Sequence, residues 1–223
     1  MALAGVCIGL ASAGLAEEST DLRALGIASA ALPTTVTGVK RQGNKILTVK
    51  VSVKTADGQV TAGAVPEIAV VQSPRWSPND AQREGASEVE ILLCAARMIT
   101  THPLSGIVGV GNNRGMFIPA ANDALHMTAC MGIPVVRVGR STAAREQNNL
   151  FIEGGALSTD DARRLLTVCL LRFGAPPPAA NPAHPTAAES SAIQQKLQSY
   201  QTVFDTQGAV RVAATEAVSH LGS

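Results

Sequence analysis

The fold is decided by the stretch GIVGVGNNRG, residues 106–115, in which a run of small and β-branched residues leads into a glycine- and asparagine-rich loop. A continuous apolar run of this length is typical of a parallel strand that is covered on both faces. Similar runs lie on either side, at 68–71 and 133–138, and a shorter one lies at 151–152. Segments with helical periodicity separate them. The sequence therefore predicts an α/β fold, a Rossmann-like parallel sheet flanked by helices.

Three helices are predicted around these strands. The first begins at Ser77-Pro78, an N-cap followed by proline, and its predicted apolar face consists of Val89, Leu92, Leu93, Ala96 and Ile99. The second covers 119–131. The third follows Ser158, has two aspartates in its first turn and ends at Gly174, and it carries the strongest amphipathic pattern in the chain.

The flanking segments differ in kind from this central part. Before it, apolar and polar residues alternate over 46–53 after the turn signal Gly43-Asn44, as in a half-buried strand of a β-hairpin. After it, 175–187 contains five prolines and reads as a linker, and 188–223 reads as a helical tail. We divide the chain into 1–64, an α/β domain at 65–174, the linker and the tail.

Composition excludes several classes of function. The net charge is +1 and aromatic residues make up 3% of the chain, so nothing indicates a nucleic-acid or membrane partner. The four cysteines form no CxxC pair, which predicts free thiols and no metal site. The four histidines are scattered. We therefore expect no metal or organic cofactor.

The N-terminal segment allows two interpretations. The small-residue apolar run at 2–16 resembles a signal peptide, yet no basic residue precedes it. It reads equally as a buried strand at the start of a shortened domain. The missing basic residues favour a cytoplasmic location over a secreted or periplasmic one.

Two loops are candidates for binding, because ligands of doubly wound sheets lie where loops leave the carboxyl ends of strands. The first is 111–115, whose glycines allow close backbone approach and whose asparagines offer amide groups. The second follows the strand at 133–138. Its two arginines, Arg137 and Arg140, either bind an anion or hold neighbouring loops or a subunit interface by salt bridges.

Taken in order, these segments resemble the C-terminal domain of bacterial-type L-asparaginases and glutaminase-asparaginases. The counterparts of the family's GVGNGN, VVRSSR, G-x-L and KAR-x-LL motifs are GVGN at 109–112, VVRVGR at 135–140, GAL at 155–157 and DARRLL at 161–166. The resemblance covers about 110 residues, and the hairpin before them resembles the family's G-x-I-x-x-G-K-I segment. It implies a homo-oligomer, or pairing with full-length asparaginase subunits, and 1–64 as a remnant of the N-terminal domain.

The resemblance also implies an activity, the hydrolysis of L-asparagine, or of glutamine, by a threonine nucleophile and without a cofactor. The family's threonines lie in TGGTI and GTDT motifs of the N-terminal domain, and neither TGGT nor GTDT occurs in this sequence. No catalytic residue is therefore assigned. An accessory substrate-binding set is implied by the family's second loop asparagine and its glutamate, and here it consists of Asn112, Asn113, Arg114 and Glu146.

Three functions remain open from the sequence. The chain is an asparaginase-family amidohydrolase polypeptide, truncated and without its nucleophilic threonines. Alternatively, it is a catalytically inactive asparaginase-like module that binds ligands or other subunits. The third possibility, an unrelated Rossmann-like nucleotide-binding domain, lacks the GxGxxG sequence that such a site needs.

Overall fold

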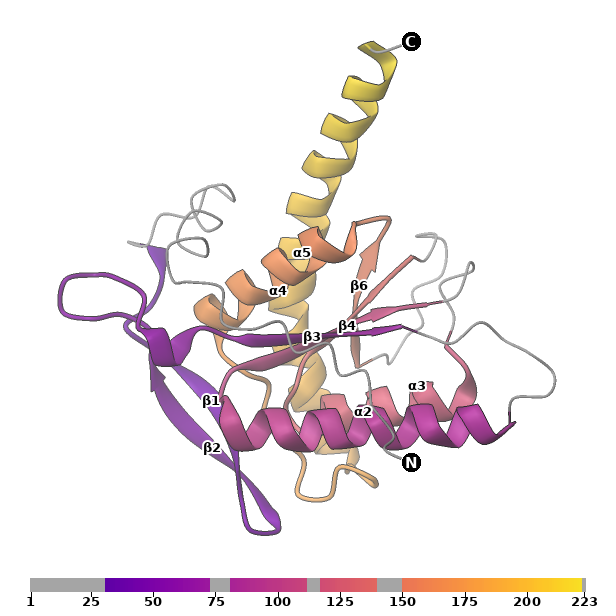
Figure 1. The fold of residues 1–223 in the computed structure, drawn as a ribbon. Helices are drawn as coiled ribbons and strands as arrows, with labels where there is room; N and C mark the ends of the chain where they lie inside the picture. Colours follow the sequence, from indigo (N-terminus) through magenta and orange to yellow (C-terminus); the bar gives the residue numbers. More distant parts are fainter. Residues whose placement is uncertain (1–30, 73–80, 112–116, 140–149, 222–223) are drawn as a thin grey trace, which may run out of the picture.

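Strand β4 (Ser105–Val110), which contains the apolar run of the deciding stretch, lies inside a four-stranded parallel sheet. A computed structural model describes residues 31–72, 81–111, 117–139 and 150–221, without the side chains of 81–87 and 207–221. The sheet has the order β3-β4-β5-β6, where the other strands are β3 (Glu67–Gln72), β5 (Val135–Val138) and β6 (Phe151–Gly155) (Figure 1). The predicted α/β fold is confirmed.

Helices cover both faces of this sheet. Helices α2 (Ala81–Thr101) and α3 (Pro119–Cys130) lie on one face and α4 (Thr159–Phe173) lies on the other (Figure 1). Helix α4 packs directly on β4, since a Cβ added at Gly106 would lie 2.7 Å from Leu166 Cδ2. Glycine in the centre of the sheet therefore allows the helix to approach closely.

The predicted β-hairpin is also confirmed. Strands β1 (Thr35–Gln42) and β2 (Lys45–Ser52) pair antiparallel, and Gly43 takes the positive φ of +60° that the tight turn requires. Two backbone hydrogen bonds join β1 to later parts of the chain, one to the α/β domain and one to the start of the proline-rich segment. Val39 N–H donates to the Pro103 carbonyl at 2.8 Å, and Ala175 N–H donates to the Thr37 carbonyl at 2.7 Å.

The predicted apolar face of α2 is wrong in part. Ile99 is buried as expected, but Val89 and Leu93 are 55% and 64% exposed. The buried stripe instead runs through Ile91, Ala95, Met98 and Ile99. Helix α2 carries two apolar stripes with helical spacing, and periodicity alone does not say which of them meets the sheet.

Helix α4 has the ends that the sequence predicts. Ser158 Oγ accepts a hydrogen bond from the Asp161 N–H at 3.1 Å, and Gly174 follows the last turn with a φ of +73°. The carbonyl groups at this end are satisfied from helix α5 (Ala187–Leu221), because Lys196 Nζ donates to the Phe173 carbonyl and the buried Tyr200 hydroxyl donates to that of Gly174.

The proline-rich segment 175–187 lies against the α/β domain. Ala175 and Ala179 are buried, and Ala179 N–H donates to the Cys130 carbonyl at 2.8 Å. The segment ends in a capping box, in which the Thr186 N–H donates to Glu189 Oε2 at 2.8 Å and the Glu189 N–H donates to Thr186 Oγ1 at 3.2 Å. One long helix, α5, follows where the sequence predicts a helical tail.

We expect this capping box to make stability pH-dependent. Hydrogen bonds from the Ala180 N–H, and then from Thr186, lower the pKa of Glu189 from its ordinary 4.5 to about 2. Because the pKa is depressed in the folded state, the stabilisation is complete above pH 4.5 and is lost as the pH falls towards 2. Glu189→Gln should therefore melt below the wild type at pH 6 and together with it near pH 2. Thermal denaturation measures both, and an equal difference at both pH values would contradict this.

The β6 edge of the sheet is covered by one side chain of α5. Gln201 Oε1 accepts from the Glu153 N–H at 2.8 Å, and Gln201 Nε2 donates to the Glu153 carbonyl at 3.1 Å. The side-chain amide thus satisfies both backbone groups of that residue, as a neighbouring strand would.

Candidate functional site

All four strands end level at one edge of the sheet. Gln72, Val110, Val138 and Gly155 are aligned across the strand pairs, each at or next to the carboxyl end of its strand. The loops that leave these strands therefore start side by side, which is where parallel α/β sheets bind ligands.

The four residues predicted from the resemblance belong to two of these loops. Asn112, Asn113 and Arg114 follow β4, and Glu146 follows β5; all four lie outside the described residues. The starts of the two loops are adjacent, since the Gly111 N–H donates to the Val138 carbonyl at 3.4 Å. The Gly139 N–H in turn donates to the Gly155 carbonyl at 2.9 Å. The topology of the sheet thus places the first residues of both predicted loops, Gly111 and Gly139, side by side.

The far end of the first loop is held by Phe117. A Cβ added at Gly109 of β4 would lie 2.8 Å from Phe117 Cζ, so the ring occupies the space that the missing side chain leaves. Glycine at this position therefore allows the chain to return onto the strand from which the loop departed.

This contact is testable by substitution and rescue. We expect Gly109→Ala to destabilise the protein by about 1–2 kcal/mol, because the ring has to move away from the added methyl group. Adding Phe117→Leu should recover part of the loss by freeing that space. Chemical denaturation of the two single variants and of the double variant measures these losses in the free energy of unfolding. A loss in the double variant that equals or exceeds the sum of the two single losses would contradict the prediction.

Arg137 lies beside this edge, and its contacts decide whether it binds an anion or forms a salt bridge within the chain. Its guanidinium forms an ion pair with Glu153 Oε1 at 2.5 Å and stacks on the Phe151 ring at 4.6 Å. The two charged side chains are 5% and 15% exposed. Arg137 therefore holds β5 to β6, as the salt-bridge interpretation predicts, while Arg140 lies outside the described residues.

Sequence reasoning missed Glu153 as the partner of Arg137. A single acidic residue in an otherwise apolar strand, Phe151-Ile152-Glu153, was a usable signal. An isolated carboxylate in a covered sheet needs a cation, and Arg137 is the cation of the neighbouring covered strand.

Two thiols of the described chain, those of Cys130 and Cys169, are unsuited to nucleophilic catalysis. Cys94, Cys130 and Cys169 are free, as predicted. Burial, with a smaller contribution from Glu189, raises the pKa of the Cys130 thiol to about 11, and burial raises that of Cys169 further. Both thiols stay protonated at neutral pH, and the thiolate is the reactive form.

The described histidines lie apart, as the sequence indicates. His102 Nδ1 lies 2.7 Å from Glu67 Oε2, at the amino end of β3, and His126 meets the Phe151 ring edge-on at 6.3 Å. His184 lies in the turn at 181–184. Among the described residues no group of three or more His, Cys, Asp or Glu side chains is placed to hold a metal ion.

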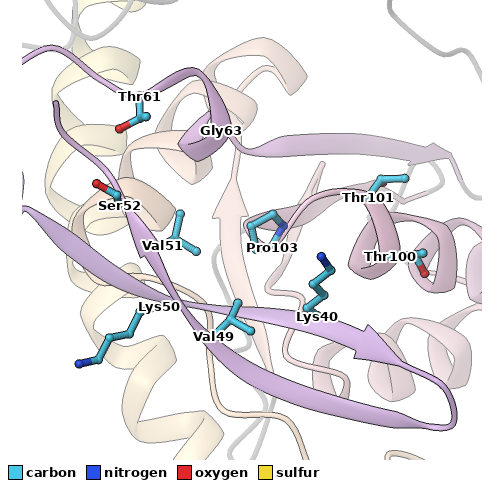
Figure 2. A pocket seen from close by; sticks show the side chains of 10 residues that line it. All are labelled: Lys40, Val49, Lys50, Val51, Ser52, Thr61, Gly63, Thr100, Thr101 and Pro103. Atoms are coloured by element: carbon cyan, nitrogen blue, oxygen red, sulfur yellow. The ribbon is translucent and has the colours of Figure 1, made fainter.

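A surface hollow of about 440 Å³ lies elsewhere, between the hairpin and the last turn of α2. Its lining includes Lys40, Thr61, Thr101 and Pro103, and Lys40 extends toward the end of α2 while Lys50 turns away (Figure 2). The hollow lies at the amino ends of the strands and contains none of the predicted binding residues, so we do not assign the site to it.

Comparisons with known proteins found no match for this chain. No protein-family model matches the chain, and neither the curated proteins nor the solved structures include a match. Within the described residues, no helix is both long enough and apolar enough to span a membrane.

Proposed function

We propose that this chain is an asparaginase-family polypeptide that binds the amino acid substrate at the carboxyl edge of its sheet and does not supply the nucleophile. The observation that carries the proposal is the level edge, where the loops beginning at Gly111 and Gly139 start side by side. The order of the family-like motifs along the sequence supports the same assignment.

The proposed reaction is the hydrolysis of the side-chain amide of L-asparagine. Water is consumed, the carbon–nitrogen bond breaks, and L-aspartate and ammonia are released. An enzyme of this class first transfers the acyl group to a threonine hydroxyl. Since the two threonine motifs are not in this sequence, another polypeptide or a longer gene product has to provide them.

Within this proposal the loop residues hold the substrate and do not react. The amide oxygens of Asn112 and Asn113 are suited to accept hydrogen bonds from the α-ammonium group. Glu146 would add a charge-assisted contact to the same group, and Arg114 would attract the α-carboxylate. No metal or organic cofactor takes part.

The second candidate is a catalytically inactive module that binds an amino acid or another subunit. One observation favours it. Arg137 and Glu153, two charged residues behind the carboxyl edge, form an ion pair with each other, and the thiols of Cys130 and Cys169 are buried. Neither set of groups is placed to take part in bond breaking.

Two measurements separate the candidates. We expect the purified chain to release no ammonia from L-asparagine or L-glutamine, and to release it when mixed with an asparaginase subunit that carries the threonine motifs but lacks its own C-terminal domain. Turnover by the chain alone would refute the claim that the nucleophile is absent. Binding without turnover in the mixture would support the inactive module.

The binding site is tested by calorimetric titration with both amino acids. We expect Asn112→Ala with Asn113→Ala to weaken binding at least about tenfold, the loss of one or two hydrogen bonds to a charged group. The matched control is Asn181→Ala, because Asn181 lies in the turn after the buried Ala179 and its side chain bonds only locally, to the Ala183 N–H. Equal binding by both variants, or no binding by the wild type, would refute the proposed site.

A further inference from the structure

The hairpin carries an exposed apolar residue inside a basic face. Leu47 of β2 is 40% exposed. Its direct partner across the hairpin is Lys40, and Lys45 lies two residues before it on the same face, since alternate residues of a strand share a face. No acidic residue occurs between 22 and 56, so the hairpin itself carries none.

Helix α2 carries the opposite surface. Val89 and Leu93 are one helical turn apart, and they are 55% and 64% exposed. Glu88 and Glu90 flank Val89 along the helix, so acidic groups lie on both sides of the apolar stripe. Within the described part of the chain, none of Lys40, Lys45, Glu88 and Glu90 takes part in an ion pair.

We propose that the hairpin face around Leu47 in one copy of the chain docks on the Val89–Leu93 stripe of a second copy. The two surfaces have the same design, an exposed apolar centre with charged residues beside it, and their charges are opposite. Complementary charge of this kind selects a partner and its orientation, and burial of the apolar centres supplies the attraction.

The second copy is required because the hairpin of the same chain lies at the carboxyl end of α2, whereas the stripe lies in the middle of that helix. Its Lys40 lines the hollow beside Thr100 and Thr101, the last residues of that helix. Leu93 precedes Thr101 by eight residues, which is about 12 Å along the axis of an α-helix. The hairpin and the stripe of one chain thus lie apart, and only a neighbour brings them into contact.

Such a contact is head-to-tail, because two different surfaces meet. Repetition of one head-to-tail contact produces a closed ring or an open chain of copies. A two-stranded ribbon on one helix buries less surface than a typical stable interface, so we expect reversible association. Its charged groups are exposed, and the association should therefore weaken with salt.

Sedimentation velocity over a concentration series tests the proposal. We expect the wild type to associate by about 200 µM, with an association constant about tenfold lower at 500 mM than at 50 mM NaCl. Two charge reversals, Lys40→Glu with Lys45→Glu and Glu88→Lys with Glu90→Lys, should each abolish association. A mixture of the two variants should restore it, because each then offers the surface that the other needs.

The control is Lys50→Glu, which reverses one charge on the opposite face of the hairpin, where residue 50 pairs with Thr37. It should associate like the wild type. A monomeric wild type at about 200 µM, an equal effect of Lys50→Glu, or no restoration in the mixture would each overturn the proposal. Dissociation by the α2 variant alone would also overturn it, by indicating a helix-to-helix contact between copies. Circular dichroism spectra and melting temperatures of all variants should match the wild type.

Discussion

Replacing Gly174 by alanine should destabilise the protein by at least about 3 kcal/mol, which lowers the melting temperature by roughly 6–12 °C for a chain of this size. Gly174 has a φ of +73° and a ψ of 175°, a combination that is essentially restricted to glycine. A Cβ there would also lie 2.4 Å from the Thr37 carbonyl oxygen and 2.7 Å from the Thr37 nitrogen. These are backbone atoms of β1, so relief requires the hairpin to move.

Two other glycines separate the cost of backbone strain from the cost of the steric contact with Thr37. Gly58 has a φ of +76° but open space around it, so Gly58→Ala should cost about 1 kcal/mol from backbone strain alone. Gly63 has open space and no positive φ, so Gly63→Ala should change stability by less than about 0.5 kcal/mol. Thermal denaturation ranks the three variants. A Gly174→Ala loss no larger than that of Gly58→Ala would show that the contact with Thr37 is unimportant.

The second large effect is expected at the buried ion pair. Arg137→Leu should cost about 3 kcal/mol, because it leaves the Glu153 carboxylate without its cation in a largely covered position. Glu153→Leu should cost a similar amount by leaving the guanidinium, whose side chain is 5% exposed, without its anion. Replacing both by leucine removes both charges, so the double variant should be more stable than either single variant.

Urea denaturation of the four proteins completes a double-mutant cycle for this pair. The control is Asp160→Asn, which affects a surface pair with Arg163 at 3.9 Å and should cost about 0.5 kcal/mol or less. Additive losses from Arg137→Leu and Glu153→Leu would contradict a coupled pair. They would mean that each side chain contributes through its other contacts instead.

The elements that local sequence predicted well are those whose signals lie inside the element. Helix α4 begins and ends where Ser158 and Gly174 predict, since the capping groups are neighbours in the chain. The hairpin turn at Gly43 is of the same kind. Strands β4 and β5 were identified because both of their faces are covered and their residues are mostly apolar. Strand β3 was identified from its apolar run, although it lies at the edge of the sheet and its Val70 is 41% exposed.

The errors arose where distant contacts decide the outcome. The face of α2 that is buried depends on where α3, β1 and β3 lie, and α2 has two apolar stripes that could occupy that position. For the same reason no local pattern indicates that Lys196 and Tyr200 donate to the last carbonyls of α4, over 20 residues away. At the candidate site, the position of the loops follows from strand order, whereas the roles of Asn112 and Asn113 stay predictions.

The pairing of Gln201 with Glu153 has a consequence for synthesis of the chain. The two residues are 48 positions apart, so the strand emerges from the ribosome well before the amide that shields it. At ordinary elongation rates this interval lasts about 2–10 s. During that time the nascent sheet has an open side on which a neighbouring nascent chain can add a strand. Slow codons between residues 153 and 201 should therefore lower the soluble yield, and the same codons placed after residue 201 should not.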